Sequence, residues 1–262
     1  MKRVLLGVLL YLMSIAAYAG YTVVLVHGYL GSGEQWRPTG IVYALERHGW
    51  LDAGHLFPEG PFPAVIPNVS QRYLYTVTLP SEASLPIQAQ WLDNYLTYLQ
   101  NQHPNNIIFL VGHSAGGVVA RLVTVYSQLP IKGLLTIASP HLGTKAAEFG
   151  AWLSDTPFSW FAPFAGLNTI NRSENLYWDL VREHPTTPLF ALNRRPHPQI
   201  HYTAIVRQHD DIVPSYSQDM NQVPALTGQV NVIVSSGKHK LRPADGPVIA
   251  QELERWITQE EQ

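Results

Sequence analysis

The sequence predicts one α/β domain with a mostly parallel central sheet and helices on both of its faces. Strand-like and helix-like patterns alternate from residue 21 to the end of the chain, as expected for such a sheet. The first predicted strand, residues 21–26, is a continuous apolar, β-branched run, which is typical of a strand buried on both sides. A length of 262 residues fits one large domain with a substantial core.

The predicted elements follow one another without an internal repeat. The first predicted helix is amphipathic, because Ile87, Trp91, Tyr95 and Leu99 recur at helical spacing along one face. Strands are expected at residues 21–26, 72–79, 107–111, 131–138, 199–207 and 229–234, and helices at 86–102, 116–126 and 247–258.

Residues 145–198 break this alternation. The segment is rich in aromatic residues, has scattered prolines and contains no clean strand pattern. This pattern predicts a helical cap inserted between two strands of the sheet. Such a cap either forms a lid with an apolar inner face or packs its aromatic side chains into a small second core. A second, proline-rich excursion spans residues 54–67.

Residues 1–19 resemble a secretory signal peptide rather than part of the fold. Lys2 and Arg3 precede an apolar run, and Ala17-Tyr18-Ala19 supplies the small residues of a cleavage site. The run is shorter than the roughly 20 residues that a membrane-spanning helix needs. We expect residues 20–262 to form the mature domain, exported to the periplasm or secreted. An uncleaved N-terminal membrane anchor is the alternative.

Composition excludes several kinds of function. A formal net charge of -2, with no run of Lys or Arg, offers no electrostatic basis for binding nucleic acid. The chain has no cysteine, which excludes thiol nucleophiles, thiolate metal sites and disulfides.

The strongest local motif is G-H-S-A-G-G at residues 112–117. It lies between a predicted strand and a predicted helix, the setting in which G-x-S-x-G forms a nucleophile elbow. Side chains at the flanking glycine positions would clash in so sharp a turn, which presents Ser114 as a nucleophile. The amide of Ala115 is then available to stabilise an oxyanion. The alternative is a glycine-rich turn made only for packing.

A second glycine-rich turn, H-G-Y-L-G-S-G at residues 27–33, follows the first predicted strand. Glycines let backbone amides approach a developing negative charge. We expect the amide of Tyr29 to be the second oxyanion donor, with its ring lining the pocket. A flexible loop is one alternative and a phosphate cradle another, although the G-K-[ST] ending of a P-loop is missing.

Four residues near these turns and in the cap are the candidates for contacting substrate: His27, Leu30, His113 and Trp160. His27 is expected to orient the loop rather than to act as a base. The ring of His113 is expected to pack against the sheet rather than to titrate.

Together these motifs resemble those of lipases and related esterases of the α/β-hydrolase superfamily. The oxyanion turn, the elbow and S-P-H-L-G-T at residues 139–144 carry the resemblance. It covers most of residues 21–127 and the later strand ends, and is weak through 145–198. It implies an α/β-hydrolase fold with a helical lid or cap, and ester hydrolysis as the activity, although the substrate has to be argued from the site.

The resemblance also implies a catalytic acid and base. In this fold the chain order is Ser, then Asp or Glu, then His. Residues 210–214, D-D-I-V-P, resemble the D-x-[IL]-V-P pattern of lipases, which aligns Asp210 as the acid and leaves Asp211 one residue off. His239 is the one histidine after this acid, and it precedes the last predicted helix, where the base of the family lies.

The expected reaction is a two-step acyl transfer. His239 removes the proton of Ser114, Asp210 stabilises the imidazolium, and the amides of Tyr29 and Ala115 hold the oxyanion. This chemistry requires no metal and no organic cofactor. The expected partner is a small-molecule ester or a lipid, with contact to a lipid interface if the cap is an apolar lid. The alternatives are an acyltransferase or thioesterase with the same triad, and a non-catalytic binding protein with the same fold.

Overall fold

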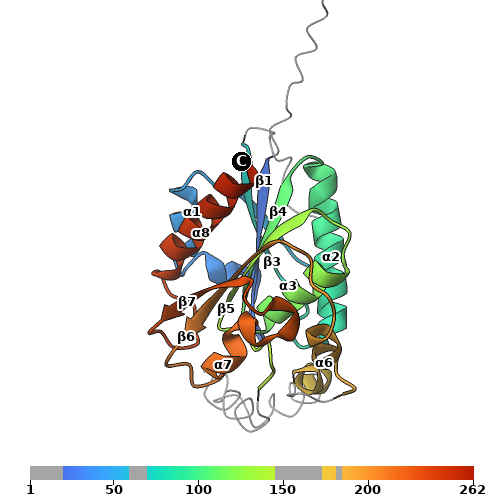
Figure 1. Ribbon diagram of the computed structural model, residues 1–262. Coiled ribbons are helices and arrows are strands. Elements are labelled where there is room, and N and C mark those ends of the chain that lie inside the picture. Colours follow the sequence, from blue (N-terminus) through green and yellow to red (C-terminus); the bar gives the residue numbers. More distant parts are fainter. Residues whose placement is uncertain (1–19, 59–69, 145–172, 181–184) are drawn as a thin grey trace, which may run out of the picture.

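The computed structural model describes residues 20–58, 70–144, 173–180 and 185–262. In that part of the chain seven strands form one sheet in the order β2-β3-β1-β4-β5-β6-β7, and all six neighbouring pairs are parallel (Figure 1). This confirms the predicted α/β-hydrolase fold, with a parallel sheet and helices on both faces.

The predicted strands and helices form close to their predicted bounds. The strands are β1 (Tyr21–Val26), β2 (Leu51–Leu56), β3 (Arg72–Val77), β4 (Ile107–His113), β5 (Ile131–Ile137), β6 (His201–Arg207) and β7 (Val230–Ser235). The helices are α1 (Ile41–Glu46), α2 (Leu85–Gln102), α3 (Ala115–Tyr126), α6 (Pro188–Asn193), α7 (Ser215–Gln218) and α8 (Asp245–Glu260), with short 3-10 turns at η1 (Gly33–Trp36), η3 (Met220–Gln222) and η4 (Pro224–Leu226).

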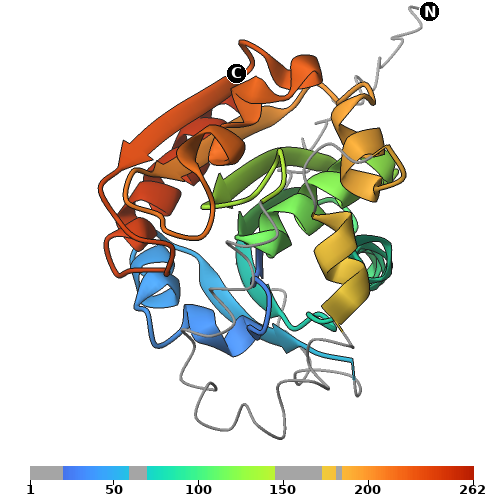
Figure 2. The same ribbon diagram turned by 90° about the horizontal axis from the view of Figure 1, so that it is seen from below.

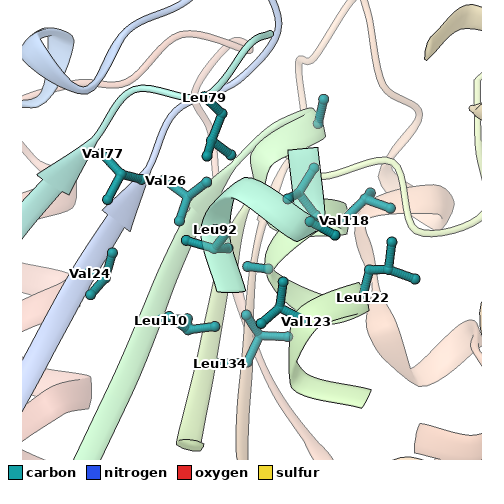
Figure 3. Close-up of a cluster of buried hydrophobic side chains, with 14 of the residues drawn as sticks. Val24, Val26, Val77, Leu79, Leu92, Leu110, Val118, Leu122, Val123 and Leu134 are labelled. Atoms are coloured by element: carbon teal, nitrogen blue, oxygen red, sulfur yellow. The ribbon is translucent and has the colours of Figure 1, made fainter. Parts of the chain in front are cut away.

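The sheet separates two apolar cores. Helices α1 and α8 cover one face, and α2 and α3 cover the other (Figure 1). Side chains alternate between the faces along a strand, so Val24 and Val26 of β1 pack toward α2 and α3 (Figure 3), whereas Val23 and Leu25 pack toward α1 and α8. All four are fully buried, which explains why the sequence of β1 is continuously apolar.

The parallel arrangement gathers the functional loops at one edge. Because the strands all run in one direction, the turns after β1, β4, β6 and β7 leave from the carboxyl end of the sheet, which Figure 2 views from below. Strand β1 lies between β3 and β4, so the turn after β1 is next to the turn that carries Ser114. This edge is where ligands bind in open α/β sheets.

The sequence did not reveal β2 or α1. Strand β2 is an edge strand with the sequence L-D-A-G-H-L, is only partly buried, and has a register shift between Asp52 and Gly54. An edge strand with few apolar residues lacks the pattern on which strand prediction depends. The prediction of a proline-rich loop from residue 54 is therefore wrong for residues 54–56, which belong to β2. Residues 59–69 lie outside the described part of the chain.

The buried face of α2 agrees with the predicted one at Tyr95 and Leu99 and differs from it at Ile87. Ile87 is 47% exposed, whereas Leu92 and Leu96 lie fully in the core beside Tyr95 and Leu99. Helix α3 packs along α2, so the buried stripe follows the side of α2 that meets α3 rather than the side with the largest residues.

Parts of the predicted cap are described, namely residues 173–180 and 185–198. Residues 173–179 and α6 are helical, and no residue of these two stretches is in a strand. The rest of the predicted insertion, Trp160 included, lies outside the described residues, as do residues 1–19. Among the helices that are described, none is long and apolar enough to span a membrane.

Candidate active site

Ser114 sits in a strained turn between β4 and α3. Its φ is 52° and its ψ is −130°, a conformation that residues with a side chain rarely adopt. A side chain at Gly112 would overlap the backbone of Gly117, and one at Gly116 would overlap the carbonyl oxygen of His27. The glycines on both sides of Ser114 therefore permit the close packing that raises this serine to the edge of the sheet.

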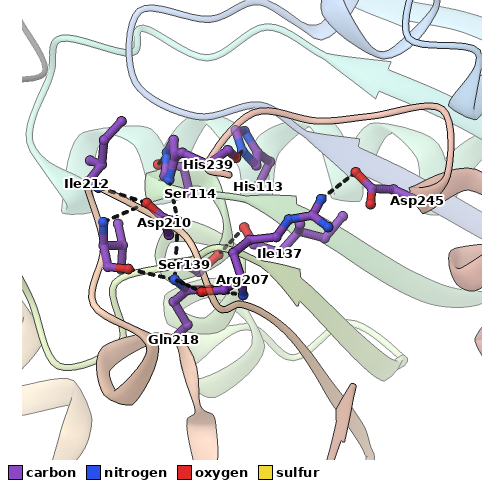
Figure 4. Close-up of polar contacts among 11 residues, drawn as sticks. His113, Ser114, Ile137, Ser139, Arg207, Asp210, Ile212, Gln218, His239 and Asp245 are labelled. Atoms are coloured by element: carbon purple, nitrogen blue, oxygen red, sulfur yellow. Dashed lines mark hydrogen bonds and ion pairs between the residues drawn. The ribbon is translucent and has the colours of Figure 1, made fainter. Parts of the chain in front are cut away.

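Three side chains from separate loops form one hydrogen-bonded chain. The Nε2 atom of His239 is 2.9 Å from Ser114 Oγ, and its Nδ1 atom is 2.8 Å from Asp210 Oδ2 (Figure 4). An ionised carboxylate only accepts hydrogen bonds, so Nδ1 carries the proton and Nε2 accepts from the serine hydroxyl. This is the tautomer in which a histidine can remove a proton from serine.

Asp210 is held in place by burial and by two backbone amides. Its side chain is fully buried, and Oδ1 accepts hydrogen bonds from the amides of Ile212 and Val213, both at 2.9 Å. Asp211, by contrast, is 67% exposed and lies 4.0 Å from Lys238 Nζ. The structure thus brings Asp210, and not Asp211, to His239.

Gln218 is a further member of this network that sequence reasoning missed. Its side-chain amide donates to Asp210 Oδ2 at 3.2 Å and to the carbonyl of Val213 at 2.6 Å. Its side-chain oxygen accepts from the amide of Arg207 at 2.7 Å. The residue is buried on α7, where no motif marks it. It ties the loop of the acid to the end of β6.

The loop between β7 and α8 is anchored by a buried ion pair. Arg207 and Asp245, both almost completely buried, are 2.5 Å apart. The hydroxyl of Ser235 accepts from Arg207 at 2.8 Å and from Arg242 at 2.7 Å. These contacts fix both ends of the segment that carries His239.

The two predicted oxyanion residues both line the cavity at Ser114. Ala115 is the first residue of α3, so its amide has no acceptor within the helix and lies at the positive end of the helix dipole. The hydroxyl of Tyr29 donates to Ser173 Oγ at 2.7 Å, which joins the oxyanion turn to the helical residues 173–179.

Three of the four predicted substrate contacts lie outside the lining of the cavity at Ser114, and the fourth, Trp160, lies outside the described residues. None of His27, Leu30 and His113 is among the residues that line the cavity at Ser114. His27 is buried, accepts a hydrogen bond from the amide of Leu79 at 2.8 Å, and donates to the carbonyl of Gly28 at 2.7 Å. Desolvation lowers its pKa to about 4, so it is neutral near pH 7 and orients the turn. Leu30 packs on the core with a φ of 52°.

The cavity at Ser114 is small, about 10 Å³, which is room for one water molecule. A groove of about 420 Å³ lies elsewhere, between α2, α3 and α6, and contains no residue of the hydrogen-bonded chain. The small cavity is lined by Tyr29, Ser114, Ala115, Pro140, Thr144, Leu180, Ile212, Val213 and His239.

The S-P-H-L-G-T segment, residues 139–144, follows β5 and contributes two residues to the lining of the cavity at Ser114. The hydroxyl of Ser217 accepts from the amide of Leu142 at 3.1 Å and donates to the carbonyl of Gly143 at 2.7 Å. Pro140 and Thr144 are thereby placed against the cavity. Within the part of the chain that the structure describes, no group of three or more His, Asp or Glu side chains is arranged to hold a metal ion.

A parallel seven-stranded sheet with a strained serine between strand and helix defines a protein of the α/β-hydrolase fold. The chain belongs to the alpha/beta hydrolase family, whose model matches residues 23–256.

Solved structures from several organisms share the fold. A putative cell surface hydrolase from Lactobacillus plantarum has a TM-score of 0.62 at 15% identity, covering 92% of both chains. An esterase from Pyrococcus furiosus has a TM-score of 0.60 at 15% identity, covering 92% of this chain and 83% of its own. A thioesterase of prodiginine biosynthesis in Streptomyces coelicolor has a TM-score of 0.55 at 19% identity, covering 92% and 86%. The comparison with curated protein sequences gave no match to this chain.

Proposed function

We propose that this protein hydrolyses carboxylic esters through an acyl-enzyme intermediate on Ser114. The hydrogen-bonded chain of Ser114, His239 and Asp210 carries the proposal, because it has the geometry, order and tautomer of a serine-hydrolase triad. A strained serine, a buried acid and a histidine that joins them are not needed for packing alone.

In the proposed reaction His239 takes the proton of Ser114 while Oγ attacks the ester carbonyl. The amides of Ala115 and Tyr29 stabilise the oxyanion, and Asp210 stabilises the imidazolium. Collapse of the intermediate expels the alcohol, which takes the proton from His239. Water then attacks the acyl-enzyme, with His239 as base, and releases the acid and free Ser114.

The cavity at Ser114 does not distinguish acyl chains by their length. About 10 Å³ is room for one water molecule, so even an acetyl group requires movement of the lining residues. We propose an esterase for small-molecule esters, because one neighbour in fold is an esterase, with a lipase that contacts a lipid interface as the alternative. A thioesterase or acyltransferase shares the same triad, and one neighbour in fold is a thioesterase. We also propose that residues 1–19 direct export, either as a cleaved signal or as an anchor.

A fluorophosphonate probe tests the nucleophile. The wild-type protein should be labelled, and Ser114→Ala should abolish labelling and ester hydrolysis. Ser127→Ala, at the other end of the same helix, is the matched control and should be labelled normally. An unlabelled wild-type protein would support the non-catalytic binding protein instead.

A panel of p-nitrophenyl esters and thioesters of increasing chain length separates the substrate classes. We expect the highest kcat/KM with acetyl or butyryl oxygen esters and free acid as the product. Higher rates on emulsified long-chain esters would establish the lipase, preference for thioesters the thioesterase, and acyl transfer to added alcohol the acyltransferase.

A further inference from the structure

His113, the last residue of β4, connects the nucleophile elbow to the loop that carries His239. Its Nε2 atom is 2.8 Å from the carbonyl oxygen of His239, and the two rings are 5.1 Å apart at 48° (Figure 4). The segment around His239, between β7 and α8, is neither helix nor strand, and the neighbouring Lys238 is 79% exposed. The hydrogen bond from His113 therefore fixes this segment at a point where helix or strand hydrogen bonds do not hold its backbone.

The chemistry of the partner settles the proton of His113. A carbonyl oxygen only accepts, so Nε2 carries the hydrogen and donates it. A second proton would have to enter at Nδ1, which faces Gly28 in the turn after β1. Desolvation, followed by the nearby charge of His239, lowers the pKa of His113 to about 3, against smaller opposite effects of its hydrogen bond to the His239 carbonyl and of Asp210. His113 is thus a neutral donor near pH 7 and does not compete with His239 as a base.

The contact closes a ring through the two reacting residues. Ser114 follows His113 in the chain, His113 binds the carbonyl of His239, and the imidazole of His239 binds Ser114 Oγ at 2.9 Å. Within this ring, a shift of the loop moves the backbone of the base away from the nucleophile only if the bond from His113 breaks. Reacting groups have to be held within a fraction of an ångström for efficient attack.

We propose that His113 is a positioning residue, which fixes the backbone of His239 so that its imidazole stays in reach of Ser114. The inference rests on the proposed function and adds a role to the second residue of the elbow motif.

Three replacements of His113 separate the hydrogen bond from the packing of the ring. The amide nitrogen of glutamine is three bonds from Cβ, like Nε2 of histidine, whereas that of asparagine is only two bonds away, like Nδ1. His113→Gln can therefore reach the carbonyl of His239, and His113→Asn cannot. His113→Phe keeps a ring and removes the donor.

The kcat for p-nitrophenyl acetate should be higher in the variant whose side chain can donate to the carbonyl of His239 than in the variants whose side chains cannot. We expect kcat to fall about 10- to 100-fold in the Asn and Phe variants with KM nearly unchanged, and to stay within a few-fold of wild type in the Gln variant. His103→Phe is the control, because it removes a buried histidine that lies away from the site. The Nε2 atom of His103 is 2.8 Å from the hydroxyl of Tyr75. It should lower the melting temperature without lowering kcat. Equal kcat in the Gln and Asn variants would overturn the proposal.

Proton NMR supplies a readout that does not need turnover. The proton shared by His239 Nδ1 and Asp210 gives a strongly downfield resonance when the pair is ordered, and we expect it to persist in wild type and His113→Gln but to broaden in His113→Asn. An unchanged resonance in the Asn variant would contradict the positioning role. A wild-type protein that shows the resonance but neither labelling nor hydrolysis would refute the proposed function instead, so the two failures are distinguishable.

Discussion

Asp210 and Asp211 are adjacent and chemically identical, yet their environments give them different chemistry. Asp210 is fully buried, bonds His239 at 2.8 Å and accepts two backbone amides, whereas Asp211 points to solvent near Lys238. A buried carboxylate costs free energy unless hydrogen bonds compensate for lost water. The amides of Ile212 and Val213 and the side chain of Gln218 provide that compensation and aim Asp210 at the base.

Replacing each aspartate with asparagine tests this difference. Asp210→Asn keeps an oxygen for the amides of Ile212 and Val213 but no longer favours the tautomer in which Nε2 of His239 accepts from serine. We expect kcat/KM for p-nitrophenyl acetate to fall by about 10⁴-fold, the order seen when a triad loses its acid. Asp211→Asn is the matched control and should remain within about twofold of wild type. If kcat/KM fell further in Asp211→Asn than in Asp210→Asn, Asp211 would be the catalytic acid instead.

The helical residues 173–179 are joined by contacts at both ends to the edge of the domain that carries Ser114. Ser173 accepts from the hydroxyl of Tyr29, and Asp179 Oδ2 accepts at 2.6 Å from the amide of Leu85, the first residue of α2. Directly after them Leu180, whose carbonyl accepts from Thr144 at 3.0 Å, is buried against the cavity at Ser114. This segment therefore limits the size of the cavity at Ser114.

Shortening Leu180 should change acyl-chain preference. Leu180→Ala enlarges the cavity, and we expect the ratio of kcat/KM for hexanoyl over acetyl esters to rise about tenfold, since a methylene in an apolar pocket is worth roughly 1–3 kcal/mol. Leu176→Ala removes a core side chain of the same segment that does not line the cavity. Both variants should lose roughly 2–5 kcal/mol of stability, but only Leu180→Ala should change the ratio. Equal ratios would show that Leu180 does not define the pocket.

Buried neutral histidines link the stability of the whole domain to pH. His27, His141 and His197 are each less than a tenth exposed. Desolvation lowers the pKa of His27 and His197 to about 4 and that of His141 well below its usual value. The unfolded chain binds protons at these residues below about pH 6.5, and the folded protein does not. The stability that the three neutral histidines contribute to the folded domain is thus fully present above pH 6.5 and is lost as the pH falls toward 4.

Urea unfolding at pH 7.5 and pH 5 measures this effect. Each of the three histidines should remove about 1.4 kcal/mol of stability per pH unit below 6.5, so the free energy of unfolding should fall by several kcal/mol. In His197→Gln the fall should be smaller than in wild type, because one of these groups no longer titrates. A free energy of unfolding equal at both pH values would contradict the account.

Features that depend on chain neighbours were predictable from the sequence. The glycines around Ser114 permit a turn that is set by local sterics, and the apolar runs of β1 and β4 specify strands buried on both faces. Chain order then left His239 as the single candidate for the base. The edge strand β2, which buries little apolar surface, left no comparable pattern.

Features that depend on contacts between distant residues required the tertiary structure. His239 is 125 positions from Ser114 in the sequence and 29 from Asp210. The order of the strands in the sheet brings the three side chains into contact. The same packing selects Gln218 and the carbonyl partner of His113, and it sets the size of the cavity. Periodicity and local sterics encode a strand or a turn, but not which side chains from separate loops converge at one edge.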